Sequence, residues 1–427
     1  MPPPIQHDGA VTDQAGYWEL VRGNAHFRRL WIGNVVSLLG DWFNTIALYT
    51  LVLRLTGSPF ALGAVFIFKM LPWALASPIA GVLVDRYNRR RLMIVSDLVR
   101  AVVVLGFLLV DEATDVYLVY GLIAAQVMAG SVFVPAKSAS IPNITSLREL
   151  LTANTLMSAS WSVMLALGAA LGGFATEWLG EHAVFIIDSL TYLVSAFFIY
   201  RTVIPQRTDA PPQGSVVRTA LREMADGWGF LRAEPRVGRI ALAKMTWAIG
   251  GGALVYALTL LGDEVAPHAL AAGIGILFAA RGLGTGIGPV VARAVFKDEE
   301  RWPLVIGVFI AFSGLCYATV SVIPWTLAAV LILVLLAHST SGANWVMATV
   351  LLQKRTEDRY RGRVFATEWF LVMMADTASI LTASVALEAG LFDLRTCFQA
   401  FALVQVFCGV LWLLLVVPRE RKAAVTG

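Results

Sequence analysis

The chain has 427 residues, of which 58% are hydrophobic and only 15% are charged. Soluble globular domains average about 45–50% apolar and about 25% charged residues, so this composition excludes a soluble protein and predicts an integral membrane protein. The formal net charge of +4 does not indicate a nucleic-acid partner, because the basic residues lie in short clusters between apolar runs.

The apolar residues form runs long enough to cross a bilayer, since about 20 residues of helix span about 30 Å of hydrocarbon. Residues 1–28 are polar, and we expect them to be a cytoplasmic N-terminal tail. A six-helix bundle is predicted at residues 29–203, with apolar runs at 30–55, 60–84, 92–110, 116–134, 153–174 and 183–203.

The longest polar segment follows at residues 204–239 and contains a basic amphipathic stretch at 216–232. We expect a cytoplasmic linker whose helix lies on the membrane surface. Residues 418–427 are predicted to be a cytoplasmic tail. Between them, residues 240–417 form a second predicted six-helix bundle, with runs at 240–261, 269–295, 304–322, 325–352, 364–387 and 397–417.

Arginine and lysine are concentrated in alternate connections between these runs, starting with the turn that holds Arg86, Arg89, Arg90 and Arg91. The other connections are rich in aspartate and glutamate. Because basic loops stay in the cytoplasm, this pattern predicts an even number of spans with both termini inside.

The sequence carries no motif for a cofactor, a metal ion or an enzymatic reaction. The cysteines Cys316, Cys397 and Cys408 lie inside apolar runs without metal-ligand spacing. It contains no phosphate-binding glycine loop of the GxxxxGK[ST] kind and no serine near a His/Asp pair. We therefore expect neither an ATP-driven pump nor a membrane hydrolase.

The basic turn after the second run has a weaker copy after the eighth. The segment 81–90 reads GVLVDRYNRR and the segment 288–297 reads GPVVARAVFK. The glycine, the first arginine and the last basic position match, whereas Asp85 is replaced by Ala292. A degenerate copy at the equivalent place in the other half indicates a duplicated transporter fold.

The pattern Gly81-x-x-x-Asp85-Arg86-x-x-Arg89-Arg90 resembles the loop signature of the major facilitator superfamily. Residues 39–42, 56–58, 135–136 and 361–364 are similar to a bacterial branch that contains macrolide-efflux and enterobactin-exporter proteins. The resemblance implies an all-α fold of twelve transmembrane helices in two pseudo-symmetric bundles. It also implies a monomer in the bacterial cytoplasmic (inner) membrane and proton-driven export through a central cavity.

The resemblance further implies a latch on the cytoplasmic side, in which Asp85 lies near the start of the eleventh helix and the arginines pair with nearby acids. A carboxylate is favoured beside a helix N-terminus, and Gly81 allows two helices to approach closely. The alternative is that the arginines only anchor the topology. The predicted latch consists of Gly81, Asp85, Arg86, Arg89, Arg90, Asp97, Arg100 and Glu368.

Two departures from the superfamily's patterns weaken the antiport prediction. The fourth helix carries Gln126 where an arginine is often tied to proton coupling, and residues 168–173 lack the proline of the antiporter signature. The glycines there still predict close packing of the fifth helix against the eighth, through Gly168, Gly172 and Gly173 facing Gly282, Gly284, Gly286 and Gly288.

Four ionisable residues lie near the middle of predicted spans, where each costs at least about 2.5–3.5 kcal/mol and is a functional candidate. They are Asp41, Asp376, Lys69 and Arg281, and we predict that they couple transport to protons. In the superfamily's packing Lys69 could pair with Asp376 across the bundles, and rocking would break the pair and let the acid take up a proton. The alternative is a fixed structural ion pair or a lysine that snorkels to the interface.

Polar residues at helical spacing predict the faces that line the cavity. They are Asn34, Ser37 and Asn44 in the first helix, Gln126 in the fourth, and His338, Ser341, Asn344 and Trp345 in the tenth. A lone histidine in this setting also suits a hydrogen bond between helices.

From these observations we expect a proton-coupled exporter of amphipathic, drug-like small molecules, whose partners are the substrate, protons and the lipid bilayer. The alternatives are an exporter of a siderophore or another native metabolite, and a lysophospholipid or lipid flippase of the same fold. A lipid carrier is expected to open laterally between the second and eleventh helices.

Overall fold

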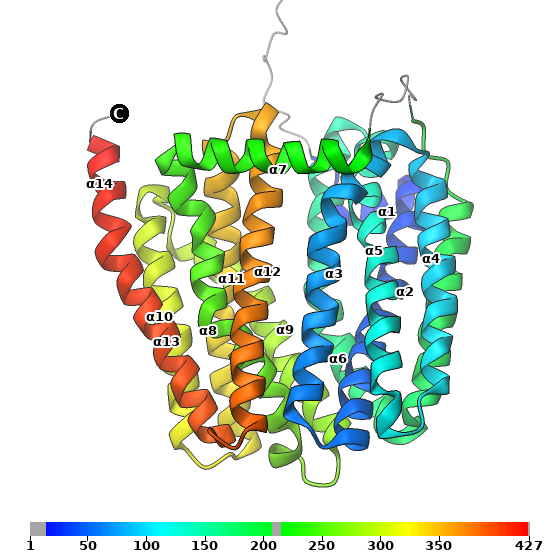
Figure 1. Ribbon diagram of the computed structural model, residues 1–427. Coiled ribbons are helices and arrows are strands. Elements are labelled where there is room, and N and C mark those ends of the chain that lie inside the picture. Colours follow the sequence, from blue (N-terminus) through cyan, green and yellow to red (C-terminus); the bar gives the residue numbers. More distant parts are fainter. Residues whose placement is uncertain (1–13, 207–214, 426–427) are drawn as a thin grey trace, which may run out of the picture.

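The computed structural model describes residues 14–206 and 215–425, and this part of the chain is almost entirely helical (Figure 1). Residues 1–13, 207–214 and 426–427 of the predicted tails and linker lie outside the described residues. The first bundle consists of α2 (Ala25–Thr56), α3 (Pro59–Arg86), α4 (Arg89–Leu105), α5 (Val116–Ile144) and α6 (Leu147–Tyr200). The second consists of α8 (Pro235–Val265), α9 (Leu270–Val295), α10 (Trp302–Val322), α11 (Leu327–Arg355), α12 (Asp358–Glu388) and α13 (Leu394–Leu415).

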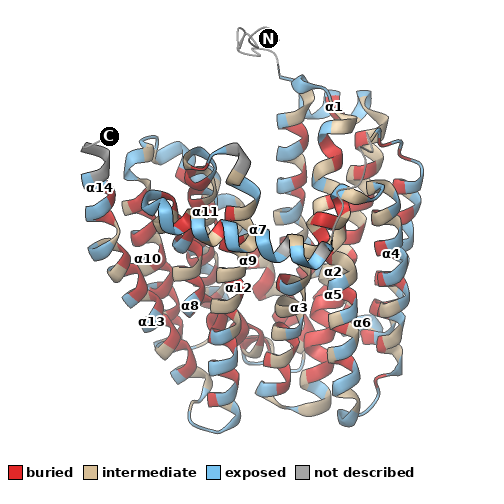
Figure 2. Ribbon diagram, turned by 45° about the horizontal axis from the view of Figure 1, so that its top comes forward, coloured by how far each residue is buried: buried red, intermediate tan, exposed pale blue. Residues whose placement is uncertain are grey.

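Shorter helices lie at the ends and between the bundles. They are α1 (Tyr17–Gly23), α7 (Val216–Ala233), α14 (Val417–Val425), and the 3-10 turns η1 (Gly106–Leu109), η2 (Ala113–Asp115) and η3 (Glu299–Arg301). Within the bundles, buried residues lie on the helix faces turned inward and exposed residues on the outer faces (Figure 2).

The 54-residue helix α6 contains two membrane spans joined at Gly180. Gly180 has φ 79° and ψ 163°, a backbone conformation that is essentially restricted to glycine. Eleven helices in the described residues are long and apolar enough to cross a membrane. Because α6 crosses twice, they provide the twelve spans that the sequence predicts.

The predicted glycine packing between the fifth and eighth spans is only partly correct. A Cβ on Gly173 would come within 2.5 Å of the Ala271 carbonyl of α9, so this glycine does let the two helices approach closely. However, Gly168 and Gly172 pack against Trp42 and Phe43 of α2. Neighbouring positions on a helix are about 100° apart, so one glycine-rich stretch serves two interfaces.

Two of the predicted glycines of α9 also face a different partner. A Cβ on Gly284 would lie 2.5 Å from the carbonyl of Leu335, and one on Gly288 would overlap the carbonyl of Ser339. Both contacts are with α11 rather than with α6. These glycines therefore hold the second bundle together instead of joining it to the first.

The two bundles are joined at the end of the molecule opposite to α7, which we call the far end. Ser58 Oγ donates a hydrogen bond of 2.7 Å to Glu388 Oε2, and the Phe60 backbone N–H donates to the same oxygen at 3.1 Å. Tyr256 Oη donates to the Pro59 carbonyl at 2.7 Å. These bonds tie the start of α3 to α12 and α8.

At the other end, α7 lies across both bundles (Figure 1) and contacts α3, α8 and α12. Arg363 of α12 forms an ion pair of 3.2 Å with Asp226 of α7. The rings of Phe230 and Tyr360 stack with centroids 4.5 Å apart. The base of α12 is therefore attached firmly to α7.

Candidate functional site

A cavity of about 240 Å³ lies among the helices of the first bundle. Each of the five helices contributes to its lining, which consists of Asp41, Thr45, Lys69, Trp73, Arg100, Gln126, Val127, Gly130 and Tyr192. Charged, amide and aromatic groups thus converge in a region that the sequence places at mid-membrane depth, where transporter sites are usually found.

Asp41 presents an accessible carboxylate to this cavity, since 37% of its side chain is exposed. Tyr192 Oη donates a hydrogen bond to Asp41 Oδ1, and Gln126 Nε2 donates to Tyr192 Oη at 3.0 Å. Arg100 Nη1 lies 3.9 Å from the same Oδ1 atom. A chain of polar groups therefore holds one carboxylate oxygen in place.

Arg100 is buried behind Asp41 and pairs with Asp97, one turn earlier in α4. The guanidinium also lies 4.3 Å from the ring centroid of Tyr192 and 4.8 Å from that of Phe133. In this structure Asp97 and Arg100, both predicted for the latch, instead pair with each other next to Asp41. The face of α4 that carries both residues turns into the bundle, towards Asp41.

Lys69 donates a hydrogen bond of 2.6 Å to Thr45 Oγ1, and Thr45 in turn donates to the Asp41 backbone carbonyl. The predicted ion pair between Lys69 and Asp376 is not formed between these described residues. Asp376 is instead buried against Gly252 of α8, and its Oδ1 has no hydrogen-bond partner in the described part of the chain. Arg281 lies over the ring of Phe278, with 5.3 Å to the centroid.

The family model of the Major Facilitator Superfamily matches residues 30–371, which is most of the chain. The chain belongs to this superfamily. It is therefore a transporter and a multi-pass membrane protein, not an enzyme.

Curated relatives within the superfamily include exporters by name. The putative bacilysin exporter BacE of Bacillus subtilis is 24% identical over 375 residues, which cover 85% of this chain and 92% of the relative. Macrolide efflux protein A of Streptococcus pyogenes is 27% identical over 212 residues, covering 48% of this chain and 51% of the relative. The uncharacterized MFS-type transporter YfiS of Bacillus subtilis (strain 168) is 28% identical over 220 residues, and this match spans only 51% of either chain.

Solved structures share the fold at low sequence identity. A bacterial homolog of the human lysosomal transporter Spinster, in an inward-facing and unoccupied conformation, has a TM-score of 0.69 at 15% identity and covers 94% of this chain and 96% of its own. A POT family transporter in complex with 5-aminolevulinic acid has a TM-score of 0.74 at 9% identity, with coverage of 96% and 98%. These likenesses concern the fold alone.

The superfamily's loop signature is not engaged as a latch in this structure. Gly81 has open space around it, since a Cβ added there would meet nothing within 4 Å among the described residues. Asp85 is exposed and makes no hydrogen bond or ion pair with a described residue. Close helix packing at Gly81 and docking of Asp85 onto α12, both predicted above, are therefore absent here.

Two arginines of the signature, Arg89 and Arg90, bond to backbone carbonyls. Arg89 Nη1 donates to the Ala139 carbonyl at 2.8 Å, and Arg90 donates to the carbonyl of Tyr200, the last residue of α6. Cations are favoured at helix C-termini because the carbonyls there lack partners within the helix. Arg86 also has an interaction partner. Within the first bundle, these contacts of Arg89 and Arg90 hold the turn to α5 and α6.

Glu368, the remaining predicted latch residue, belongs to a buried ion pair in the second bundle. Its Oε1 lies 3.1 Å from Lys244 Nζ, and both side chains are almost completely buried. The lysine also lies 4.9 Å from the ring centroid of Trp345. Glu368, predicted for the latch, pairs in this structure with a lysine of its own bundle, because its face of α12 turns towards α8.

Among the residues predicted to line a cavity, only Gln126 lines the one at Asp41. Asn34 and Asn44 are buried and bonded within the bundle, and Ser37 is buried beside them. His338 of α11 and Tyr317 of α10 share a buried hydrogen bond of 2.8 Å, which matches the alternative of a bond between helices. The other three predicted residues of α11 do not line this cavity: Ser341, Asn344 and Trp345.

Two charged residues near the site were missed in the sequence. Asp188 of α6 is fully buried, and its Oδ2 accepts a hydrogen bond of 2.8 Å from Asn44 Nδ2. Lys137 of α5 donates to Asn34 Oδ1 at 2.5 Å. Asp188 could have been found from the sequence, because it is an acidic residue inside the sixth apolar run. Lys137 fell just beyond the predicted end of the fourth run, whereas α5 continues to Ile144.

Proposed function

We propose that this protein exports amphipathic small molecules by alternating access, in exchange for protons, with the α7 end in the cytoplasm. The observation that carries the proposal is the charged cavity with its accessible Asp41 carboxylate, in a molecule whose bundles are bonded at the far end. Near α7, by contrast, Gly81 faces open space. This arrangement suits a state that takes up substrate from the α7 end.

The positive-inside pattern supports the orientation, because the loops on the α7 side carry the arginine clusters. The names of two relatives, an exporter and an efflux protein, support the direction of transport. The substrate class rests on the cavity, in which the aromatic ring of Trp73 lies among charged and amide groups, so an amphipathic ligand finds both apolar and polar contacts.

Proton coupling is assigned in this proposal to Asp41 or Asp376, with Lys69 as the partner that changes position during rocking. Asp41 reaches the cavity, whereas Asp376 is buried at an interface of the second bundle. An intramembrane carboxylate without a tight cationic partner is suited to bind and release a proton. Asp41 is the better candidate because its path to the cavity is open.

The test is transport in vesicles that contain the purified protein and carry an imposed pH gradient, with the uncharged amphipathic dye Nile red as the probe. The parent protein is expected to move Nile red and to dissipate the gradient together. D41N is expected to uncouple the two, and D376N serves as the comparison. Unchanged coupling in both variants would overturn the assignment, and failure of the parent to move any amphipathic probe would count against export.

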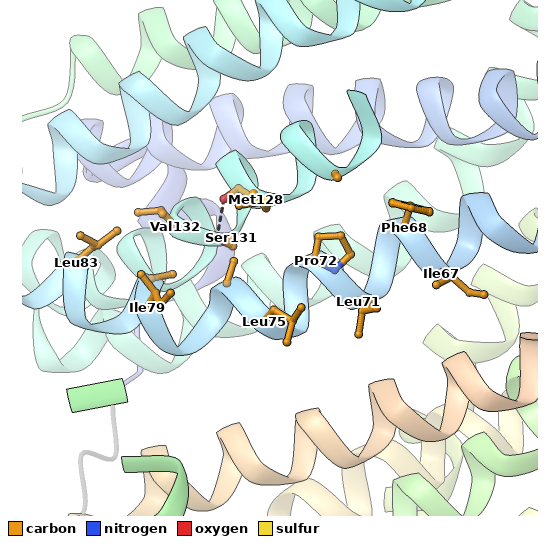
Figure 3. A pocket seen from close by; sticks show the side chains of 13 residues that line it. Ile67, Phe68, Leu71, Pro72, Leu75, Ile79, Leu83, Met128, Ser131 and Val132 are labelled. Atoms are coloured by element: carbon orange, nitrogen blue, oxygen red, sulfur yellow. Dashed lines mark hydrogen bonds between the residues drawn. The ribbon is translucent and has the colours of Figure 1, made fainter. Parts of the chain in front are cut away.

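The alternative function, transport of a lipid or lysophospholipid, predicts a lateral opening between the second and eleventh spans. An apolar groove of about 570 Å³ runs along α3 and α5, beside Pro72 and Met128 (Figure 3). In the described part of the chain its lining comes from α3 and α5 and includes no residue of α12. It is therefore not the opening between the second and eleventh spans that a lipid carrier needs, and translocation of a fluorescent lysophospholipid in the same vesicles separates the two functions.

A further inference from the structure

We propose that the cavity at Asp41 and Lys69 is a subsite for a small zwitterion, with the ammonium group at Asp41 and the carboxylate group at Lys69. This inference rests on the proposed export function and narrows its substrate class. It is carried by the hydrogen-bonding capacity that the two side chains leave unused towards the cavity.

Asp41 has one carboxylate oxygen engaged and one open. Tyr192 and Arg100 both approach Oδ1, whereas no described residue donates a hydrogen bond to Oδ2. An ionised carboxylate accepts about four hydrogen bonds, so Oδ2 can accept from a substrate ammonium. The exposed 37% of the side chain makes this oxygen reachable from the cavity.

Lys69, which also lines the cavity, likewise has unused hydrogen-bonding capacity. Its ammonium has three donors, of which one is used by the 2.6 Å bond to Thr45. The Tyr49 ring centroid is 5.6 Å away, and no carboxylate oxygen of the described residues lies within 4.0 Å of Nζ. The remaining donors can therefore bind a substrate carboxylate.

A substrate of a single charge fits this cavity poorly. A cation that pairs with Asp41 also meets the positive charges of Lys69 and Arg100, and an anion that pairs with Lys69 meets Asp41. Like charges placed together away from water are strongly unfavourable, so they select against such ligands. A zwitterion compensates the charges of Asp41 and Lys69 at once, while Arg100 stays paired with Asp97 and Asp41.

The size and the aromatic wall narrow the ligand further. The volume of about 240 Å³ is below the range of about 300–1,000 Å³ that is usual for drug-sized ligands. Trp73 offers a flat apolar face and Gln126 an amide on the lining. The chemistry points to an amino acid or dipeptide with one aromatic side chain.

Trp73 also provides a route by which binding affects the second bundle. Its ring contacts that of Trp369 in α12, with centroids 5.5 Å apart. A ligand that packs on Trp73 therefore acts on a contact between the bundles.

The experiment measures binding to the purified full-length protein by calorimetry, with L-phenylalanine and Gly–Phe as zwitterions of different charge separation. Gly–Phe amide and N-acetyl-Gly–Phe each remove one of the two charges. For the parent protein, we expect at least one zwitterion to bind about tenfold or more tightly than either blocked peptide. Equal binding of zwitterions and blocked peptides, or no binding of any of them, would overturn the proposal without the need for any variant.

Variants then assign the two charges. K69Q is expected to abolish the preference for Gly–Phe over its amide, and D41N the preference over the N-acetyl form. Lys297→Gln and Asp263→Asn, on exposed residues outside the cavity, are the matched controls and are expected to keep both preferences. If both preferences survive in K69Q and D41N, the assignment of the charges is wrong.

The result of this binding experiment can be distinguished from the result of the transport test of the proposed function. Selective binding of a zwitterion by a protein that moves nothing under a pH gradient would refute export and leave the subsite standing. Conversely, export of Nile red that no zwitterion inhibits or accompanies would refute the subsite and leave export standing.

Discussion

The ring of Trp73 in α3 packs against the ring of Trp369 in α12, with centroids 5.5 Å apart and planes inclined by 66°. Trp369 continues the contact to Trp345 of α11 at 5.4 Å, and Trp345 lies against Lys244. A row of three tryptophans thus connects the charged cavity of the first bundle with the buried ion pair of the second. Edge-to-face pairs of this kind contribute about 0.5–1.5 kcal/mol each beyond their burial.

Replacing Trp369 by alanine is expected to shift the protein away from the present conformation, because the Trp73 contact joins the bundles in it. The loss of about 0.5–1.5 kcal/mol corresponds to a shift of up to about tenfold in the equilibrium. The shift is measured by the rate of maleimide labelling at G81C, because Gly81 faces open space in the present conformation. This labelling rate is expected to fall when W369A is added. W178A is the control, because Trp178 contacts Phe174 of its own helix; equal labelling rates in W369A and its parent would contradict the prediction.

Replacing Glu388 by alanine is expected to loosen the far end, since its carboxylate accepts bonds from Ser58 and the Phe60 backbone. Ile380 is 1% exposed at the α3–α12 contact, so I380C is expected to label slowly in the parent and several-fold faster with E388A. The three native cysteines are buried and give a low background. E264A, at an exposed acid without a hydrogen bond in the described residues, is expected to leave the rate unchanged.

Gly180→Ala is expected to destabilise the protein by about 1–3 kcal/mol, because a side chain is strained at φ 79° and ψ 163°. Thermal unfolding in detergent measures the change as a lower midpoint. Gly121 is the matched control, because it lies inside α5 with nothing within 4 Å of an added Cβ. Similar midpoints for G180A and G121A would show that the junction of the two spans tolerates another conformation.

The buried pair of Lys244 and Glu368 is expected to respond differently to single and double replacement. K244M leaves a buried carboxylate without its cation, which costs about 3–5 kcal/mol, whereas K244M/E368M removes both charges and recovers much of the loss. Unfolding in denaturant measures both. If the double variant is no more stable than K244M, the pair stabilises the bundle through packing on Trp345 rather than through compensation of charge.

The spans could be predicted from the sequence because apolar runs of bilayer length are a strong signal. The gap between the predicted runs 153–174 and 183–203 indicates a polar loop around Glu177 and Glu181, whereas in the structure the two spans meet at Gly180 alone. The reason is that Gly180 turns the chain within a single residue. Length and polarity of a connection do not reveal whether a glycine makes such a turn.

The candidate site was predicted less completely, for a related reason. Asp41 and Lys69 stand out as charges in apolar runs, and the structure brings them to one cavity. The sequence assigns Arg100 to the latch, whereas the structure places it at the cavity. The depth of a residue in the membrane does not show which way its helix face points. Helices that are apolar on nearly every side carry little periodicity, so their rotation, and hence the partners of their charged residues, depends on packing.

The attachment of α7 bears on how the loop signature can work. Because α7 is fixed to the base of α12 by the pair of Asp226 with Arg363 and by the Phe230–Tyr360 stack, it travels with the second bundle. It nevertheless touches α3 of the first bundle. Under the proposed alternating access, rocking of the bundles is expected to slide α3 along α7, because α7 is fixed to one bundle and touches the other. With α7 on the membrane surface, as the sequence predicts, the lipid headgroups at this helix are expected to influence the rate of that movement.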